Sequence, residues 1–343
     1  MIPRLEISFT LNQQWQFLFG KPYQPEANEF LLNHCRSGIM LALRALKLPQ
    51  GSKVGMMVYN CHTVMNAIAE AGCVPVFIDV TDNLTIDIDD LKRRCNGLQA
   101  LVVTHLFGIE NDIAAIRHLF PNLPVIEDCA HAGGKEHAEG DFAVYSIGQG
   151  KLPSLGDGGI LVVNNSHYLS AVEQEYESVP EYSALATMKL FCRMLFKSWL
   201  YLPLVYKCFT LPLKLHRGEA SAREHIVLKR MCNGVSAMYN SVIVNIPAMI
   251  ERRRVNAMKL QEQLSVMPSV ESTLLGANAF MLVAACGDTA ALHVVLQSKG
   301  IDSATHFAGA LRWAACFGYS QGSCPNAETL IDKLLMIPTY KSK

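Results

Sequence analysis

Six short apolar runs between residues 53 and 165 constrain the fold of this chain most strongly. The runs are nearly continuous in apolar residues, and helix-like segments separate most of them. Continuous apolar strands are typical of a mainly parallel sheet that helices cover on both faces. The pattern therefore predicts an α/β fold, in which ligands bind at the carboxyl ends of the strands. The runs cover residues 54–59, 74–80, 100–108, 124–128, 142–147 and 159–165.

The remaining segments predict how the chain divides. Residues 1–237 are expected to form a large mainly parallel α/β domain, and residues 238–343 a small C-terminal α+β domain. Residues 1–33 give no clear periodicity and are expected to be irregular, whereas Ser37 is predicted to cap a helix that runs to about Leu46. Further helices are predicted near 62–71, 88–94, 112–120, 131–138, 167–180, 227–264 and 289–299, together with a strand at 279–285 and a last helix ending in 334–340.

Charge and cysteine content narrow the class of protein. The formal net charge is zero and no long basic run occurs, so a nucleic-acid partner is not expected. The 11 cysteines form no Cys-x-x-Cys pair, and the first residues have no apolar core of signal-peptide type. These features predict reduced thiols and a cytoplasmic protein. No metal site is predicted.

Residues 184–216 form an unusually apolar and aromatic segment that is interrupted by lysine and arginine. Its longest uncharged run, Ser198–Tyr206, contains a proline and is far shorter than the roughly 20 residues that span a bilayer. We expect a helical insert that packs on the core or on a partner subunit. The alternative, not favoured at this point, is a peripheral membrane contact that is basic on one side and aromatic on the other.

Two of the apolar runs end in groups that can do chemistry. The run at 124–128 delivers Asp128 and then His131, and the run at 142–147 delivers Ser146 and then Lys151 before a Gly-rich turn. Pyridoxal phosphate needs a lysine for a Schiff base, an acid against its pyridinium nitrogen and donors for its phosphate. These four residues therefore predict a pyridoxal-phosphate site.

Each of these residues also has an ordinary structural interpretation. A lysine is usually solvated, a histidine can be a satisfied core residue, and a serine can be a plain strand hydroxyl. The combination favours the site, because a buried acid at Asp128 needs a cationic partner and a pyridinium N–H is one. Gly38 follows Ser37 at the expected helix start, where free backbone N–H groups suit a phosphate.

Five motifs in order resemble those of the DegT/DnrJ/EryC1/StrS family of pyridoxal-phosphate sugar aminotransferases. IEDCAHA resembles the family's I-E-D-A-A-Q/H motif, and YSIGQGKLPSLGDGG resembles the motif that holds the Schiff-base lysine. SGIMLAL, VPVFIDVTDNLTIDIDDL and VVTHLFGIENDIAAI resemble three further family motifs. The resemblance implies the fold of type I pyridoxal-phosphate transferases.

The resemblance also implies roles for residues. Lys151 would hold the cofactor, Asp128 would keep its ring nitrogen protonated and His131 would orient the ring through its phenolic oxygen. Ser146 and the backbone at Gly38 and Ile39 would bind the phosphate. At the position of the family's ring-stacking aromatic this chain has Cys61, with Tyr59 and His62 nearby, and Arg230 and His306 are weaker candidates for contacts with substrate.

The activity implied by the resemblance is amino transfer, with glutamate as the expected donor. The acceptor would be the keto group of a nucleotide-linked sugar, in surface polysaccharide or secondary-metabolite biosynthesis, and the enzyme would be a homodimer. Three alternatives stay open: a catalytically inactive or regulatory paralogue of the same fold, a pyridoxal-phosphate sugar dehydratase, and an α/β binding protein without pyridoxal phosphate. In dehydratases of this type histidine replaces the lysine, so Lys151 speaks against the second.

Overall fold

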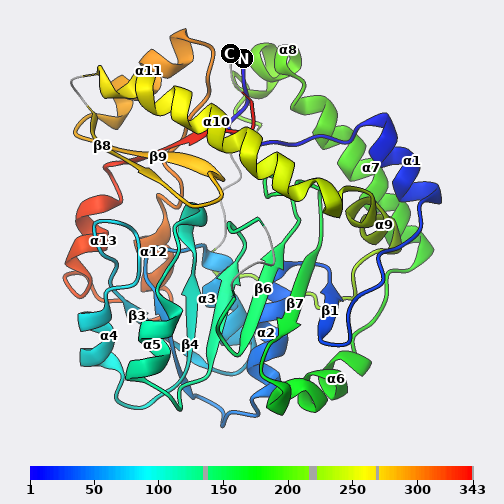
Figure 1. The fold of residues 1–343 in the computed structure, drawn as a ribbon, viewed down its shortest axis with the longest axis vertical. Coiled ribbons are helices and arrows are strands. Elements are labelled where there is room, and N and C mark those ends of the chain that lie inside the picture. Colours follow the sequence, from blue (N-terminus) through cyan, green and yellow to red (C-terminus); the bar gives the residue numbers. More distant parts are fainter. Residues whose placement is uncertain (134–137, 216–221, 268–269, 342–343) are drawn as a thin grey trace.

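The chain folds around two sheets in the computed structural model, which describes residues 1–133, 138–215, 222–267 and 270–341 (Figure 1). The larger sheet has seven strands in the order β1-β7-β6-β5-β4-β2-β3. Strands β2 to β6 run parallel, and β7 and β1 are antiparallel to their neighbours. The predicted α/β fold is therefore confirmed. The strands are β1 (Glu29–Leu32), β2 (Lys53–Met57), β3 (Val74–Ile78), β4 (Leu98–Thr104), β5 (Val125–Cys129), β6 (Phe142–Ser146) and β7 (Gly159–Val163).

Helices cover both faces of the large sheet, which explains why its strands are apolar throughout. Phe142, Val144 and Leu161 belong to the core on the side of α2 (Cys35–Ala45) and α3 (His62–Glu70). Ala143 and Tyr145 belong to a second core, which α1 (Leu11–Phe19), α7 (Ala184–Leu200) and α9 (Asn233–Val242) complete. The other helices of the large-sheet region are α4 (Ile88–Arg94), α5 (Ile113–Leu119) and α6 (Leu169–Glu177).

The smaller sheet is antiparallel and has the order β10-β9-β8. The long helix α10 (Ile246–Ser265) leads into it (Figure 1). Leu260 and Leu264 of this helix belong to the core of the smaller sheet. The elements are β8 (Val270–Leu275), β9 (Met281–Cys286), β10 (Leu334–Pro338), α11 (Thr289–Ser298), α12 (Ala310–Ala315) and α13 (Pro325–Leu330). The domain boundary between residues 237 and 238 stays a prediction.

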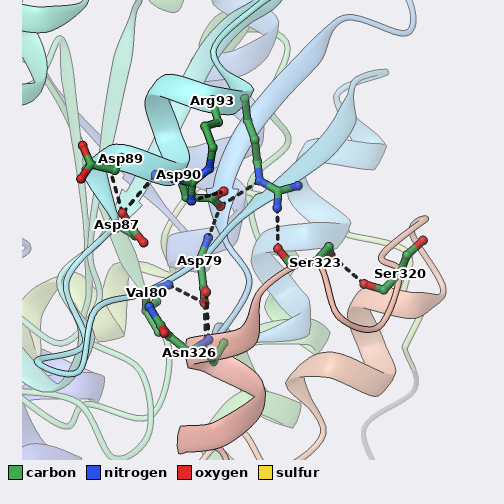
Figure 2. A network of polar contacts seen from close by, with 11 residues as sticks. Asp79, Val80, Asp87, Asp89, Asp90, Arg93, Ser320, Ser323 and Asn326 are labelled. Carbon is green, nitrogen blue, oxygen red and sulfur yellow. Dashed lines mark hydrogen bonds and ion pairs between the residues drawn. The ribbon is translucent and has the colours of Figure 1, made fainter.

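A polar network fastens α13 to the large sheet (Figure 2). The Asp79 carboxylate, just after β3, accepts hydrogen bonds from the backbone N–H groups of Asn326 and Ala327, each across 2.9 Å. Asp90 on α4 in turn accepts from the Asp79 N–H across 2.8 Å. Asp79 thus caps the start of a helix nearly 250 residues further along the chain, because the first N–H groups of a helix need an acceptor.

Some predicted elements are wrong. Residues 334–338 form β10 rather than the end of a helix, and the first 33 residues contain α1 and β1. His131 and Ala132 lie in a turn rather than a helix, and residues 134–137 of that predicted helix lie outside the described residues. The helix predicted to begin at Ser37 begins at Cys35 instead, with His34 in the extended capping position.

The segment 184–216 is helical, as expected. It comprises α7, the short α8 (Pro203–Val205) and a π-helix over Tyr206–Thr210, and residue 216 lies outside the described part. Leu190 and Met194 point into the core, so one face of α7 packs against the rest of the chain. Within the described ranges, every helix is too short or too polar to cross a membrane.

Candidate active site

A cavity of about 200 Å³ opens at the carboxyl edge of the parallel strands, where the fold class places ligands. Asp128 comes from β5, Ser146 from the end of β6, and Lys151 from the loop that follows. The structure thus brings together the four residues that the sequence analysis grouped, His131 included. Among the wall residues that the sequence analysis missed are His34, Cys35, Arg36, Asn60, Thr104 and Phe307.

Asp128 is held from three sides. Its carboxylate accepts hydrogen bonds from the Thr104 hydroxyl across 3.1 Å, from the Ala130 N–H across 3.1 Å and from the Cys35 thiol across 3.4 Å. The Asn60 amide donates to Thr104 across 2.8 Å and so fixes the direction of the threonine hydroxyl. These contacts orient an acid that is only 3% exposed.

The hydrogen bonds of His131 determine its tautomer. Its Nδ1 accepts from the Phe107 N–H across 3.0 Å, and since a backbone N–H can only donate, that ring nitrogen carries no proton. Burial and the charge of Lys151 hold the pKa of His131 well below its usual range, so the ring is neutral. Its proton therefore lies on Nε2, which makes Nε2 a hydrogen-bond donor. The ring stacks on Phe280 at 4.9 Å between centroids.

The Lys151 amine forms no ion pair with any residue that the structure describes. Its Nζ lies 5.9 Å from the centroid of the Phe280 ring. Burial lowers the pKa of Lys151, and the nearby Cys61 and Asp128 offset only part of that effect. A lysine with a lowered pKa is neutral more of the time, and a neutral amine is the nucleophile that reacts with a carbonyl.

The start of α2 corrects the prediction for the phosphate loop. Gly38 lies within the helix, where a Cβ would come within 2.5 Å of Val144 Cγ1, so this glycine serves packing rather than ligand approach. Ser37 is buried and donates to Asn33, and of the predicted loop only Ile39 lines the cavity. The first N–H groups of the helix belong instead to Cys35 and Arg36.

Two side chains at that helix end also face the cavity. Arg36 lines it and has no acceptor within the described ranges. His34 Nε2 lies 3.3 Å from the Asp157 carboxylate, and its buried Nδ1 finds no partner in the described part of the chain. Burial lowers the pKa of His34 to about 4, so this ring is neutral. A basic helix start with an unused arginine suits an anion.

The three candidates for ring stacking separate in space. Cys61 lines the cavity and accepts a hydrogen bond from the Thr63 hydroxyl across 3.1 Å. Burial raises the pKa of its thiol, but contacts with His62 and Thr63 outweigh burial, and the net pKa is lowered. Tyr59 and His62 are not part of the cavity wall: the Tyr59 hydroxyl donates to the His306 carbonyl across 2.6 Å, and His62 pairs with Glu224 at 3.4 Å.

The two weaker candidates for contacts with substrate also differ. Arg230 lies away from the cavity, where it donates to the carbonyls of Val179 and Tyr176 and stacks on the Tyr176 ring. His306 lies behind Phe307, with its ring centroid 5.8 Å from that of His131. Burial, together with the charges of Lys151 and Arg4, lowers the pKa of His306 to about 3.

A buried trio with metal-ligand chemistry lies on the same strands. The ligand atoms of His105, Glu127 and Cys129 are all within 4.8 Å of one another. Because His105 Nδ1 accepts from the Asn111 N–H, its proton is on Nε2 and is donated to Glu127 across 2.9 Å. Glu127 also accepts from the Gly140 N–H. The hydrogen bonds of His105 and Glu127 therefore explain these buried polar groups as part of the core, without a metal ion.

Comparison with known proteins agrees with this arrangement. The sequence profile of the DegT/DnrJ/EryC1/StrS aminotransferase family matches residues 26–177, which include Asp128, His131, Ser146 and Lys151. Residues 26–177 are therefore similar in sequence to this family. Members of the family depend on pyridoxal phosphate, as the resemblance implied.

Two curated relatives illustrate the match. The chain is 32% identical over 135 residues to a GDP-perosamine synthase of Vibrio cholerae, and 33% identical over 142 residues to a UDP-N-acetyl-3-dehydro-alpha-D-glucosamine 3-aminotransferase of Acidithiobacillus ferrooxidans. These alignments cover 36% and 37% of this chain, and 37% and 38% of the relatives. They therefore leave more than half of each relative unmatched.

The fold extends further than the sequence match. Spr1654 of Streptococcus pneumoniae, in its PLP form, superimposes with a TM-score of 0.73 at 15% identity and covers 99% of this chain and 94% of its own. The similarity in fold therefore includes the C-terminal region, which the family profile does not reach.

The residues present fit pyridoxal phosphate. The cavity holds an amine without a partner in the described structure, an acid with a fixed orientation and a neutral histidine with a free N–H donor. An unused arginine, two backbone N–H groups and the Ser146 hydroxyl provide donors for a phosphate. An amine, an acid and phosphate donors are what this cofactor requires.

Proposed function

We propose that this protein is a pyridoxal-phosphate-dependent aminotransferase that transfers an amino group to the keto group of a nucleotide-linked sugar. One observation carries the proposal: Lys151, with its lowered pKa, shares a cavity with the fixed carboxylate of Asp128 at the carboxyl edge of the sheet. When bound, the cofactor supplies a conjugated pyridinium ring that accepts the electrons of the bond broken at the substrate carbon.

Each protein group has a task that its surroundings support. Lys151 would hold the cofactor and would take and return a proton through Nζ, for which a lowered pKa is suited. Asp128, oriented by Thr104 and Cys35, accepts the ring N–H and keeps that nitrogen protonated. His131, whose Nδ1 is taken by the Phe107 N–H, would donate from Nε2 to the phenolic oxygen of the cofactor.

The phosphate is proposed to lie at the start of α2. The N–H groups of Cys35 and Arg36 and the Arg36 guanidinium supply donors and positive charge, and the Ser146 hydroxyl completes the set from β6. Arg36 thus takes the part that the resemblance assigned to the backbone at Gly38 and Ile39. Cys61 is the candidate to contact the ring face, since it alone of the three predicted stacking residues lines the cavity.

The substrates follow from the relatives and from the space beside the cofactor cavity. The printed names of the relatives denote GDP-linked and UDP-linked amino sugars, which supports a nucleotide sugar as acceptor. A larger cavity of about 780 Å³ shares Ser146 with the cofactor cavity and has room for such an acceptor. Glutamate is the proposed amino donor, and surface polysaccharide or secondary-metabolite biosynthesis is the proposed setting.

Three further features belong to the proposal. The enzyme is a homodimer, as the resemblance to type I transferases implies, and it is cytoplasmic. The large domain comprises residues 1–237 and the small domain residues 238–343. Measurement of the protein's size in solution tests the homodimer, and limited proteolysis around residue 237 tests the domain boundary.

The activity can be tested in two stages. The purified protein loaded with pyridoxal phosphate is first mixed with glutamate alone, and 2-oxoglutarate is measured. We expect about one equivalent per site, because the amino group stays on the enzyme until an acceptor arrives. GDP-, UDP- and dTDP-linked keto sugars are then added in turn, and the correct acceptor makes 2-oxoglutarate formation continuous.

The outcomes distinguish the alternatives. Protein that binds the cofactor but forms no 2-oxo acid from any donor amino acid would be the inactive paralogue. Loss of water from a nucleotide sugar without amination would identify a dehydratase. The Lys151→Ala variant is the control, and it should form no 2-oxoglutarate under any of these conditions.

A further inference from the structure

The outer face of α7 carries a continuous apolar stripe. Phe196 is 60% exposed and Trp199 is 52% exposed, although both are large apolar residues. Leu190 and Met194 take the buried positions on the opposite side of the helix, so the exposed residues are not a second core face. The stripe follows a spacing of three and four residues and consists of Leu185, Met188, Cys192, Phe196 and Trp199.

Further exposed apolar residues lie on the elements next to α7 in the fold. Helix α1 lies against α7 through the rings of Phe17 and Phe191, 5.3 Å apart, and through a hydrogen bond from the Phe9 N–H to the Ser198 hydroxyl across 3.0 Å. Figure 1 shows α1, α7 and α8 along one side of the molecule. We call the α7 stripe, together with the exposed residues Leu11, Trp15, Leu18, Phe19, Leu202, Leu204, Phe209, Leu213 and Leu215, the apolar face.

The charged residues of segment 184–215 have one sign. Residues 184–215 contain five lysines and arginines and no acidic residue. Arg193 and Lys197 turn toward the protein, where they contact Asp157 at 3.5 Å and Gln149 at 2.7 Å. The other three, which have no ion pair within the described residues, are Lys189, Lys207 and Lys214.

We propose that the apolar face docks on the surface of an anionic lipid bilayer and lies in its interface without crossing it. Aromatic and aliphatic side chains flanked by lysine are the composition of interfacial helices, since the apolar groups enter the acyl boundary while the cations contact the headgroups. Anionic headgroups attract each nearby lysine and arginine. Exposed aromatic patches of this extent on a single chain call for a covering surface.

A second copy of the chain fits this face less well than a bilayer does. A twofold interface places the same patch on both subunits. Here that would bring Lys189, Lys207 and Lys214 of one copy near the same lysines of the other, with no acid in segment 184–215 to pair with them, and like charges across an interface oppose association. An anionic surface supplies the opposite charge.

The docking helix also holds the loop of the cofactor lysine. Lys197 donates to Gln149, two residues before Lys151, and Met194 packs so closely on Gly156 that a Cβ there would lie 2.8 Å from its terminal carbon. The apolar face and the proposed active site are therefore joined by one helix. The docking proposal rests on the surface alone and does not depend on the aminotransferase activity.

Vesicle binding tests the proposal on the full-length protein. Flotation is measured with vesicles of equal parts phosphatidylcholine and phosphatidylglycerol, and with phosphatidylcholine alone. We expect binding to the anionic vesicles, weakened by salt, with a blue shift of tryptophan fluorescence as Trp15 and Trp199 leave water. Phe196→Ser with Trp199→Ser should weaken binding about tenfold or more.

Two further variants make the test specific. Lys207→Glu with Lys214→Glu should also weaken binding to the anionic vesicles about tenfold, while Val294→Ser with Val295→Ser, which removes exposed apolar groups on α11, should leave it unchanged. Thermal melting checks that each variant folds. The proposal is overturned if the wild-type protein does not bind anionic vesicles. It is equally overturned if the Phe196/Trp199 variant and the Lys207/Lys214 variant both bind like wild type. It is also overturned if Phe196→Ser with Trp199→Ser reduces the oligomer size by light scattering, because a second copy would then cover the face.

Discussion

The Thr104 hydroxyl donates a hydrogen bond to the Asp128 carboxylate across 3.1 Å, from β4 to the neighbouring strand β5. Asn60, which follows β2, completes the chain of donors by bonding to Thr104 across 2.8 Å. Three adjacent strands thus cooperate to set the direction of one acid. A carboxylate fixed in this way loses little orientational freedom when it meets a pyridinium N–H.

We expect Thr104→Val to weaken the binding of pyridoxal phosphate about tenfold, because the variant removes one hydrogen bond from the oriented carboxylate. Fluorescence or absorbance titration of the apo protein measures this affinity. Thr104→Ser keeps the hydroxyl and should stay within about threefold of wild type. Equal affinities for Thr104→Val and wild type would show that Asp128 does not need this contact.

Arg36 is predicted to recognise the phosphate of the cofactor. Arg36→Ala should weaken pyridoxal phosphate binding about tenfold to a hundredfold and leave the binding of pyridoxal, which has no phosphate, nearly unchanged. Arg36→Lys should retain part of the difference, since it keeps the charge and loses the planar fork. An equal loss for both ligands would place Arg36 outside the phosphate site.

Gly38 is predicted to matter for packing and not for the cofactor. Gly38→Ala should lower the free energy of unfolding by about 1–3 kcal/mol, because its Cβ would meet Val144 Cγ1 at 2.5 Å. In a Val144→Ala background the same substitution should cost less, as denaturant unfolding of the four proteins would show. Additive effects of the two substitutions would contradict the contact.

The pH dependence of stability should reveal the buried His306. Its pKa is lowered to about 3 by burial and by the charges of Lys151 and Arg4. Between that value and the ordinary 6.5, the unfolded chain binds a proton at this site that the folded chain does not. The free energy of unfolding of the apo protein should therefore fall as the pH drops from about 6.5 toward 3.

Replacing His306 with Gln should reduce that fall, because the variant has no group that titrates at this position. Buried His131 contributes in the same direction, so part of the fall should remain. Denaturant unfolding at a series of pH values compares the two proteins. Identical slopes for wild type and His306→Gln would mean that His306 does not resist protonation in the folded state.

The large sheet could be predicted from the sequence, whereas the residues that orient Asp128 at the carboxyl edge of the sheet could not. Continuous apolar runs such as 124–128 and 142–147 identify strands by themselves. Thr104 and Asn60 were missed because their role depends on the strand order, which places β4 between β2 and β5. Nothing local in the chain reveals that order.

The errors at α2 and β10 have different causes. Ser37-Gly38 looks like a cap followed by a flexible residue, yet Gly38 is needed because α2 passes close to Val144. The true start, His34-Cys35-Arg36, has no side-chain cap to signal it. Residues 334–338 are all apolar, a pattern that a buried strand and a buried helix share. Their pairing with β9 makes them a strand.

The central claim is that Lys151 is the covalent anchor of pyridoxal phosphate in this cavity. The most direct test mixes apo wild type and Lys151→Ala with the cofactor, records visible absorbance and then reduces with borohydride for peptide mass analysis. We predict a visible band and a cofactor adduct on Lys151 in the wild-type protein, and neither in the variant. A wild-type protein without the adduct, or an adduct on another lysine, would contradict the account.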